Sequence, residues 1–149
     1  EIAASKHPAL TFLVADAENL DLGETFEFVI VPDVIEHLSD VGAMFRSVRR
    51  HCGQGSRVIV TSVNPLWAPV LHLAERLGLK MPEGEHRWLS SKELRFIANE
   101  AALDTDAVCG RILLPKQVPL LAPLLNGFAA RVRSARLLCL TQVLVLFPQ

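Results

Sequence analysis

Three side chains that can bind cations or exchange protons follow one apolar run. The run covers residues 29–31, and Asp33, Glu36 and His37 come soon after it. Carboxylates accept hydrogen bonds, and a histidine beside them can act as a general base near neutral pH. Open α/β sheets place their ligands at the carboxyl ends of strands, so this spacing predicts a ligand site. The alternative is a buried strand followed by a helix whose first turn is acidic because acids suit the positive end of the helix dipole.

Asp16 is a second candidate for ligand binding. It directly follows the apolar run 11–15 and precedes Ala17. Its carboxylate can accept a hydrogen bond from a ligand amine or a ribose hydroxyl, or it can cap the turn that it begins. A similar choice applies to His37, which can act as a base or bond to the backbone of a first helical turn. Both alternatives stay open on these residues alone.

Three apolar runs are predicted to be the strands that position these side chains. They cover residues 11–15, 27–31 and 57–62, and each is nearly continuous and rich in β-branched residues. Such runs are typical of parallel strands that are covered on both faces. Between the second and third runs, residues 41–52 carry apolar side chains at helical spacing, and Ser39 stands where an N-cap belongs. The pattern predicts a β-α-β unit.

The second half of the chain predicts two more helices and a pair of strands. One helix follows the third strand and stops near Gly78. The next is announced by Ser90 and Glu93, which have the spacing of a capping box. Segments 105–114 and 136–147 alternate well enough for two strands, which we expect to form a hairpin-like pair.

Glycines and prolines indicate how two further segments are used. Gly53 and Gly55 precede a predicted strand, whereas phosphate-binding glycines follow one, so we interpret them as a helix stop and a turn. Segment 115–132 holds three prolines among many apolar residues, which excludes a strand or a regular helix interior. We expect it to form a lid or a wall of a substrate pocket over the ligand edge of the sheet.

Composition limits the class of protein. The 149 residues are 50% hydrophobic and 21% charged, which suits one soluble domain with a substantial core. The net charge of −1 argues against nucleic acid as a partner, although residues 1–40 carry −8 and the remainder carries +7. The acidic part favours a cationic ligand or is simply a solvated face.

Cysteine spacing and hydropathy exclude several classes of site. The three cysteines lie far apart and match no metal motif, so we expect free thiols in a reducing compartment, the cytoplasm, and no metal site. The longest apolar stretch near the C-terminus covers about eleven residues, which is too short to cross a bilayer. No Ser or Cys stands in a nucleophile elbow, which argues against hydrolase chemistry.

Taken together, the segments resemble the later part of a class I S-adenosylmethionine-dependent methyltransferase, of the small-molecule type that includes the ubiquinone-biosynthesis enzymes. The stretch FLVADAENLDL is similar to the family's third strand with its acid, and FEFVIVPDVIEHL to its fourth strand with a Glu-His pair. GQGSRVIVTSVNP resembles the fifth strand, and HRWLSSKELRFIANEAAL the helix before the sixth. The resemblance implies a three-layer, Rossmann-like α/β sheet that is mostly parallel, with an antiparallel C-terminal strand.

The resemblance also implies the cofactor, S-adenosylmethionine, and the residues around it. Asp16 would accept a hydrogen bond from the adenine amino group, and Ala17 would pack near the ring. Pro32 and Asp33 would lie beside the methionine part of the cofactor.

The implied reaction is transfer of the cofactor's methyl group to a small-molecule acceptor, which is hydrophobic or linked to a sugar. Glu36 and His37 would face this substrate, and one of them would take a proton from its hydroxyl. One alternative is a non-catalytic methyltransferase-like interaction module that binds no cofactor. A nicotinamide-dependent dehydrogenase is a third possibility, but it would require a glycine-rich loop that the sequence lacks.

The sequence departs from the family pattern at its start. The family's first strand ends in a glycine-rich loop and its second in a ribose-binding acid, and the 149 residues contain neither motif. We therefore expect one domain, residues 1–149, that is N-terminally truncated and holds strands 3 to 7. In the family order 3-2-1-4-5-7-6, strand 11–15 loses its neighbours and strand 27–31 keeps an open edge. We expect these two strands to pair directly, the chain to self-associate, or the 149 residues to belong to a longer polypeptide.

Overall fold

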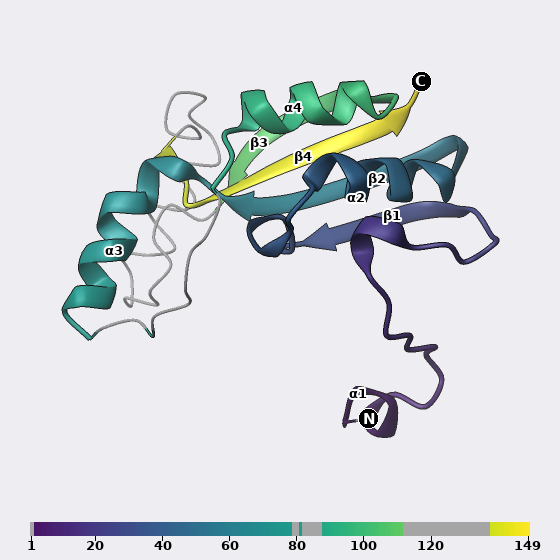
Figure 1. Ribbon diagram of the computed structural model, residues 1–149, viewed down its shortest axis with the longest axis horizontal. Helices are drawn as coiled ribbons and strands as arrows, with labels where there is room; N and C mark the ends of the chain where they lie inside the picture. The colour runs from purple at the N-terminus through teal and green to yellow at the C-terminus, as the bar shows by residue number, and fades with distance from the viewer. Residues whose placement is uncertain (1, 79–80, 82–87, 112–137) are drawn as a thin grey trace.

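The computed structural model describes residues 2–78, 81, 88–111 and 138–149. The expected lid, residues 115–132, lies outside the described residues. Within them, four strands form one sheet in the order β1-β2-β4-β3 (Figure 1). The strands are β1 (Phe26–Pro32), β2 (Cys52–Val63), β3 (Leu103–Arg111) and β4 (Thr141–Pro148).

The directions of the strands confirm the expected α/β sheet. β1 pairs with β2 in parallel, and β4 lies antiparallel to both β2 and β3. Three strands therefore point one way and the C-terminal strand points the other way. The order equals the segment 4-5-7-6 of the expected family order, and β3 and β4 form the expected antiparallel pair.

The helices differ in how they meet the sheet. In the part of the chain that the structure describes, the α-helices are α1 (Ile2–Lys6), α2 (Val41–Arg50), α3 (Ala68–Arg76) and α4 (Ser91–Glu100). The short 3-10 helices there are η1 (Ala17–Asn19), η2 (Ile35–His37) and η3 (Pro65–Trp67). α1 lies away from the sheet, at the end of an extended segment (Figure 1). None of the described helices is long and apolar enough to cross a membrane.

The core lies between one face of the sheet and the helices α2 and α4. Alternate residues of β2 and β4 point to this face, and the helices supply apolar side chains at helical spacing. The main contributors are Met44, Phe45, Val48, Val58, Val60, Leu94, Ala98, Leu144 and Leu146. On the other face, Phe28 and Ile30 are 65% and 64% exposed. The strands were expected to be covered on both faces, but among the described residues the core covers one.

Residues 11–15 do not form the predicted strand. They are extended without a strand partner, and Leu13 and Val14 are exposed. A strand needs the N–H and C=O groups of a neighbour, and none of the strands in the described residues lies beside this run. The expectation that residues 11–15 pair directly with β1 is therefore wrong.

Two predicted helix signals are confirmed and one is displaced by a residue. Ser90 and Glu93 form a capping box at the start of α4, and Gly78 follows α3 with a φ of +69°. The N-cap of α2, however, is Asp40, whose Oδ1 accepts a hydrogen bond from the Ala43 N–H at 2.9 Å. Ser39 was predicted for this place, but its position one residue earlier puts it outside the cap.

The glycines before the third predicted run belong to a strand. α2 ends at the C-cap His51, and β2 already begins at Cys52. Gly53 and Gly55 lie within β2, so their interpretation as a helix stop and turn is wrong. The pairing of β1 with β2 shifts in register between the Phe26–Cys52 pair and the Phe28–Arg57 pair. The two glycines lie instead in an irregular start of β2, where a missing side chain favours a bulge.

The open edge of β1 leads to the first testable prediction. We expect the purified chain to self-associate with rising concentration, and the Ile30→Lys variant to do so less, because an edge lysine opposes strand pairing. Sedimentation velocity over a range of concentrations measures this. Val70→Lys is the matched control, since Val70 is 52% exposed and lies on α3. A wild-type chain that stays monomeric throughout would contradict the expectation.

Candidate functional site

Asp33 is held rigidly at the carboxyl end of β1. Its N–H meets both the carbonyl oxygen and the Oγ1 of Thr61 at 3.1 Å, and the Thr61 hydroxyl donates to its Oδ1 at 2.8 Å. Its φ of +48° lies in the left-handed region, which aspartate tolerates better than most residues. Because Pro32 pairs with Thr61, the ends of β1 and β2 meet at this point.

Glu36 and His37 are neighbours in η2 but their side chains meet different surroundings. Glu36 is 7% exposed, and its Oε1 accepts a hydrogen bond from the Val63 N–H at 2.6 Å. Its Oε2 is buried and has no hydrogen-bond partner among the residues that the structure describes. His37 is exposed. Glu36 therefore ties η2 to the end of β2, whereas His37 stays accessible to a ligand.

Asp16 performs the capping role that the sequence left open. It is the N-cap of η1, and its Oδ1 accepts a hydrogen bond from the Glu18 N–H at 2.9 Å. Asp16 is exposed, and Ala17 packs partly buried against the core. Asp16 thus follows no strand, in contrast to the prediction, but one of its carboxylate oxygens is not used by the cap.

Sequence reasoning missed two buried polar residues, one in α2 and one at its C-cap, that hold the segment after η1 by hydrogen bonds. Ser47 Oγ accepts from the Leu20 N–H at 2.9 Å and donates to the Leu20 carbonyl at 3.0 Å. His51 Nε2 accepts from the Leu22 N–H at 2.8 Å, so its Nδ1 carries the hydrogen that points to the Ser47 carbonyl. Their spacing of four residues on the apolar side of a helix was the available signal.

A pocket lies at the edge of the sheet where β2 ends. It has a volume of about 740 Å³ and lies between the residues after β2, the start of α4 and the ends of β3 and β4. Its lining includes Leu66, Lys92, Val108 and the buried Gln142. The Gln142 amide nitrogen donates to Ser62 Oγ at 2.8 Å and to a backbone carbonyl at 2.6 Å. The pocket therefore combines apolar walls with a firmly held amide.

The charges around these elements are mainly acidic. Nine of the 16 acidic residues lie within residues 1–40. The hydrogen bond from the Ala43 N–H, together with Arg46, lowers the pKa of the Asp40 carboxyl below its ordinary value. Among the residues that the structure describes, no three His, Cys, Asp or Glu side chains gather closely enough to hold a metal ion.

Comparison with known families identifies one matching model. Residues 1–60 match the model described as "Methyltransferase domain". The "Ubiquinone biosynthesis O-methyltransferase" of Bradyrhizobium sp. (strain ORS 278) is 29% identical over 96 residues, which cover 58% of this chain and 38% of that protein. The protein of the same name from Rhodopseudomonas palustris (strain BisB18) is 32% identical over 96 residues, with the same two coverages. The chain thus spans about two fifths of the length of these curated relatives.

Solved structures share the fold at low sequence identity. An S-adenosylmethionine-dependent methyltransferase of Thermotoga maritima, described as a possible histamine N-methyltransferase, has a TM-score of 0.69 at 15% identity. The match covers 99% of this chain and 68% of that one. Magnesium protoporphyrin IX methyltransferase from Synechocystis PCC 6803, solved with bound SAH, has a TM-score of 0.54 at 15% identity, with 93% and 51% covered.

Proposed function

We propose that the chain forms part of a domain that methylates a small molecule. The premise is that the chain belongs to the class I S-adenosylmethionine-dependent methyltransferases. The observation that carries the proposal is the set of side chains at the joined carboxyl ends of β1 and β2. There Asp33 is hydrogen-bonded to Thr61, and Glu36 is hydrogen-bonded to the Val63 N–H. His37, the residue after Glu36, is exposed. Ligands of open α/β sheets bind at such ends.

The residues present would contact two parts of the cofactor, the adenine and the methionine part. Asp16 has a carboxylate oxygen beyond the one that caps η1, and this oxygen can accept a hydrogen bond from the adenine amino group. Ala17 would pack near the ring, and Pro32 and Asp33 would border the methionine part. The acidic character of residues 1–40 suits a cofactor with a sulfonium and an ammonium group. When bound, S-adenosylmethionine supplies an electrophilic methyl group.

His37 and Glu36 would have different roles towards the acceptor. His37 is exposed and can take the proton of an acceptor hydroxyl, while Glu36 keeps η2 against β2. A buried carboxylate oxygen without a partner is costly, so the free Oε2 of Glu36 would gain from a hydrogen-bond donor on a bound molecule. The protein's main contribution would then be alignment of the acceptor with the methyl group.

The pocket that follows the end of β2 supports an acceptor of small-molecule size. A volume of about 740 Å³ lies within the usual range for ligand pockets. Leu66 and Val108 can contact an apolar part of the acceptor, and Lys92 and Gln142 can bond to its polar groups. This combination favours a hydrophobic or sugar-linked metabolite as the acceptor.

We also propose that the protein works in the cytoplasm. Cys52, Cys109 and Cys139 form no disulfide, and thiols stay reduced in that compartment. Burial raises the pKa of the Cys52 thiol, which donates to the Val48 carbonyl, and both features favour the protonated thiol.

Chemical-shift mapping tests the proposed cofactor site directly. In ¹⁵N-labelled chain, millimolar S-adenosylhomocysteine should shift the amide signals of Asp16, Ala17 and Asp33. NADH at the same concentration is the control, because it tests the dehydrogenase alternative. The Asp16→Asn variant should show smaller shifts, whereas Asp21→Asn, in the same segment, should behave as wild type. Shifts located elsewhere, or equal shifts with NADH, would overturn the proposal.

A further inference from the structure

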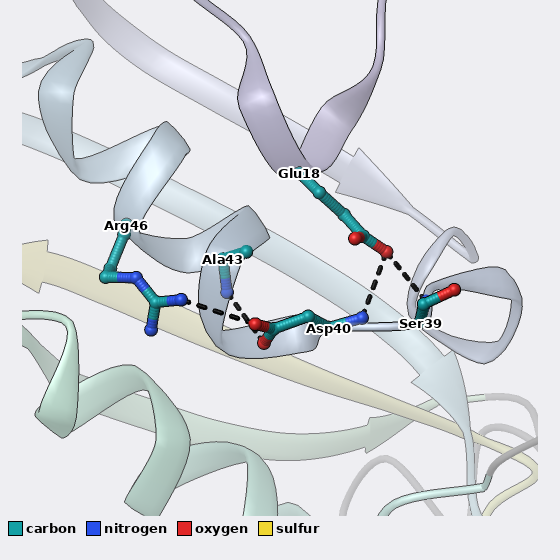
Figure 2. Close-up of polar contacts among 5 residues, drawn as sticks. All are labelled: Glu18, Ser39, Asp40, Ala43 and Arg46. Carbon is teal, nitrogen blue, oxygen red and sulfur yellow. Dashed lines mark hydrogen bonds and ion pairs between the residues drawn. The ribbon is translucent and has the colours of Figure 1, made fainter.

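One carboxylate connects two segments that are distant in the sequence. Glu18 Oε1 accepts hydrogen bonds from the N–H groups of Ser39, at 2.7 Å, and Asp40, at 3.0 Å. Figure 2 shows both contacts meeting at this single oxygen. Neither N–H lies within α2, which begins at Val41, so no helical carbonyl accepts from them. The contact is therefore a specific link between the turn at η1 and the residues that precede α2.

The link continues into α2. Asp40, whose N–H bonds to Glu18, uses its own side chain to cap the helix through the Ala43 N–H at 2.9 Å. The second oxygen of Asp40 accepts from Arg46 Nη2 at 3.3 Å (Figure 2). On the other side, the Glu18 N–H is held by Asp16. A continuous series of hydrogen bonds thus runs from Asp16 to the first turns of α2.

This link completes the anchoring of the segment between β1 and α2. Asp33 holds its start to Thr61, and Glu36 holds its middle to Val63. Glu18 holds its end at Ser39 and Asp40. His37 lies between the second and the third anchor, so its position depends on both.

We propose that Glu18 is a positioning residue that fixes the Asp16–Ala17 turn relative to the segment that carries His37. The proposal rests on the proposed function, in which these are the cofactor side and the acceptor side of one site. A carboxylate suits the task because a charged acceptor binds two N–H groups more strongly than a neutral one does. An aspartate would be one methylene shorter, and a glutamine keeps the length but loses the charge.

Amide hydrogen exchange of the full chain, measured by NMR without ligand, tests the link. In Glu18→Ala, the exchange of the Ser39 and Asp40 amides should accelerate by about tenfold or more, because both lose their acceptor. Glu18→Gln should restore most of the protection. Glu24→Ala is the matched control, since Glu24 is an exposed acid of the same segment. Core amides, such as that of Val60, should be unchanged in all three variants.

A second readout separates positioning from local stability. Without ligand, the signals of Ala17 and of the His37 ring should move together in Glu18→Ala, and return towards wild type in Glu18→Gln. With S-adenosylhomocysteine, the shifts at Asp33 and His37 should be reduced in Glu18→Ala and recovered in Glu18→Gln.

The outcomes distinguish this inference from the proposed function. Unchanged protection of Ser39 and Asp40 in Glu18→Ala, or equal acceleration of core amides, would overturn the role of Glu18. A wild-type chain whose Asp16 and Asp33 signals ignore S-adenosylhomocysteine would overturn the cofactor site, while the exchange result would still decide whether the two segments are coupled.

Discussion

Titration calorimetry of the 149-residue chain with S-adenosylmethionine or S-adenosylhomocysteine should give no saturable isotherm at micromolar concentration. The side chains that we assign to the cofactor, those of Asp16, Ala17, Pro32 and Asp33, would contact its adenine and methionine parts. The sequence contains no glycine-rich loop after a strand, and such a loop lets backbone N–H groups approach a nucleotide closely. A loss of about 4 kcal/mol in contacts lowers affinity roughly a thousandfold.

The control for this experiment is a longer protein that shares the fold. The Thermotoga maritima methyltransferase, which shares the fold with a TM-score of 0.69, should bind under the same conditions. A dissociation constant of about ten micromolar or below for the present chain would contradict the expectation. It would show that the site is complete without the glycine-rich loop.

Replacing Phe45 by Ala should destabilise the chain by about 3–5 kcal/mol. Phe45 lies on α2, is 0% exposed and packs in the core between α2 and the sheet. Truncation leaves a cavity that the surrounding side chains fill only partly. Because a domain of this size has a total stability of about 5–15 kcal/mol, the substitution should remove a large fraction of it. Urea unfolding followed by circular dichroism measures the difference.

Phe96→Ala is the matched control for the core substitution. Phe96 lies on α4 and is 69% exposed, so the same change should alter stability by about 0.5 kcal/mol or less. A cost below about 1 kcal/mol for Phe45→Ala would contradict the packing of α2 on the sheet. Such a result would also contradict the position of the segment after η1, because Ser47 and His51 bind that segment and depend on the packing of α2.

The elements that could be predicted from the sequence are those with a strong local pattern. The apolar runs at β1 and β2, the helical spacing in α2 and the capping box at Ser90 all depend on residues close together in the chain. Their physical causes, periodicity and side-chain capping, act within one or two turns. The antiparallel pair of β3 and β4 could be anticipated from alternation in the same way.

The elements that were predicted wrongly are of two kinds. One needs a neighbouring strand in space, and the other is a helix start that was misplaced by one residue. Residues 11–15 have the composition of a strand, but a strand forms only beside another backbone, and none of the described strands lies beside them. Ser39 and Asp40 are both good N-caps, and the structure selects Asp40, whose carboxylate bonds to the Ala43 N–H. Composition alone does not distinguish these cases.

For the candidate site, the sequence by itself determined that Asp33, Glu36 and His37 follow β1 closely, because their separation is set by the chain. It could not determine that Glu36 turns inward to the Val63 N–H while His37 remains exposed. Nor could it predict that Glu18 binds the backbone of Ser39 and Asp40, since 21 and 22 residues separate the partners. Burial and long-range hydrogen bonds arise only when α2 packs on the sheet and brings these segments together, so the tertiary structure decided them.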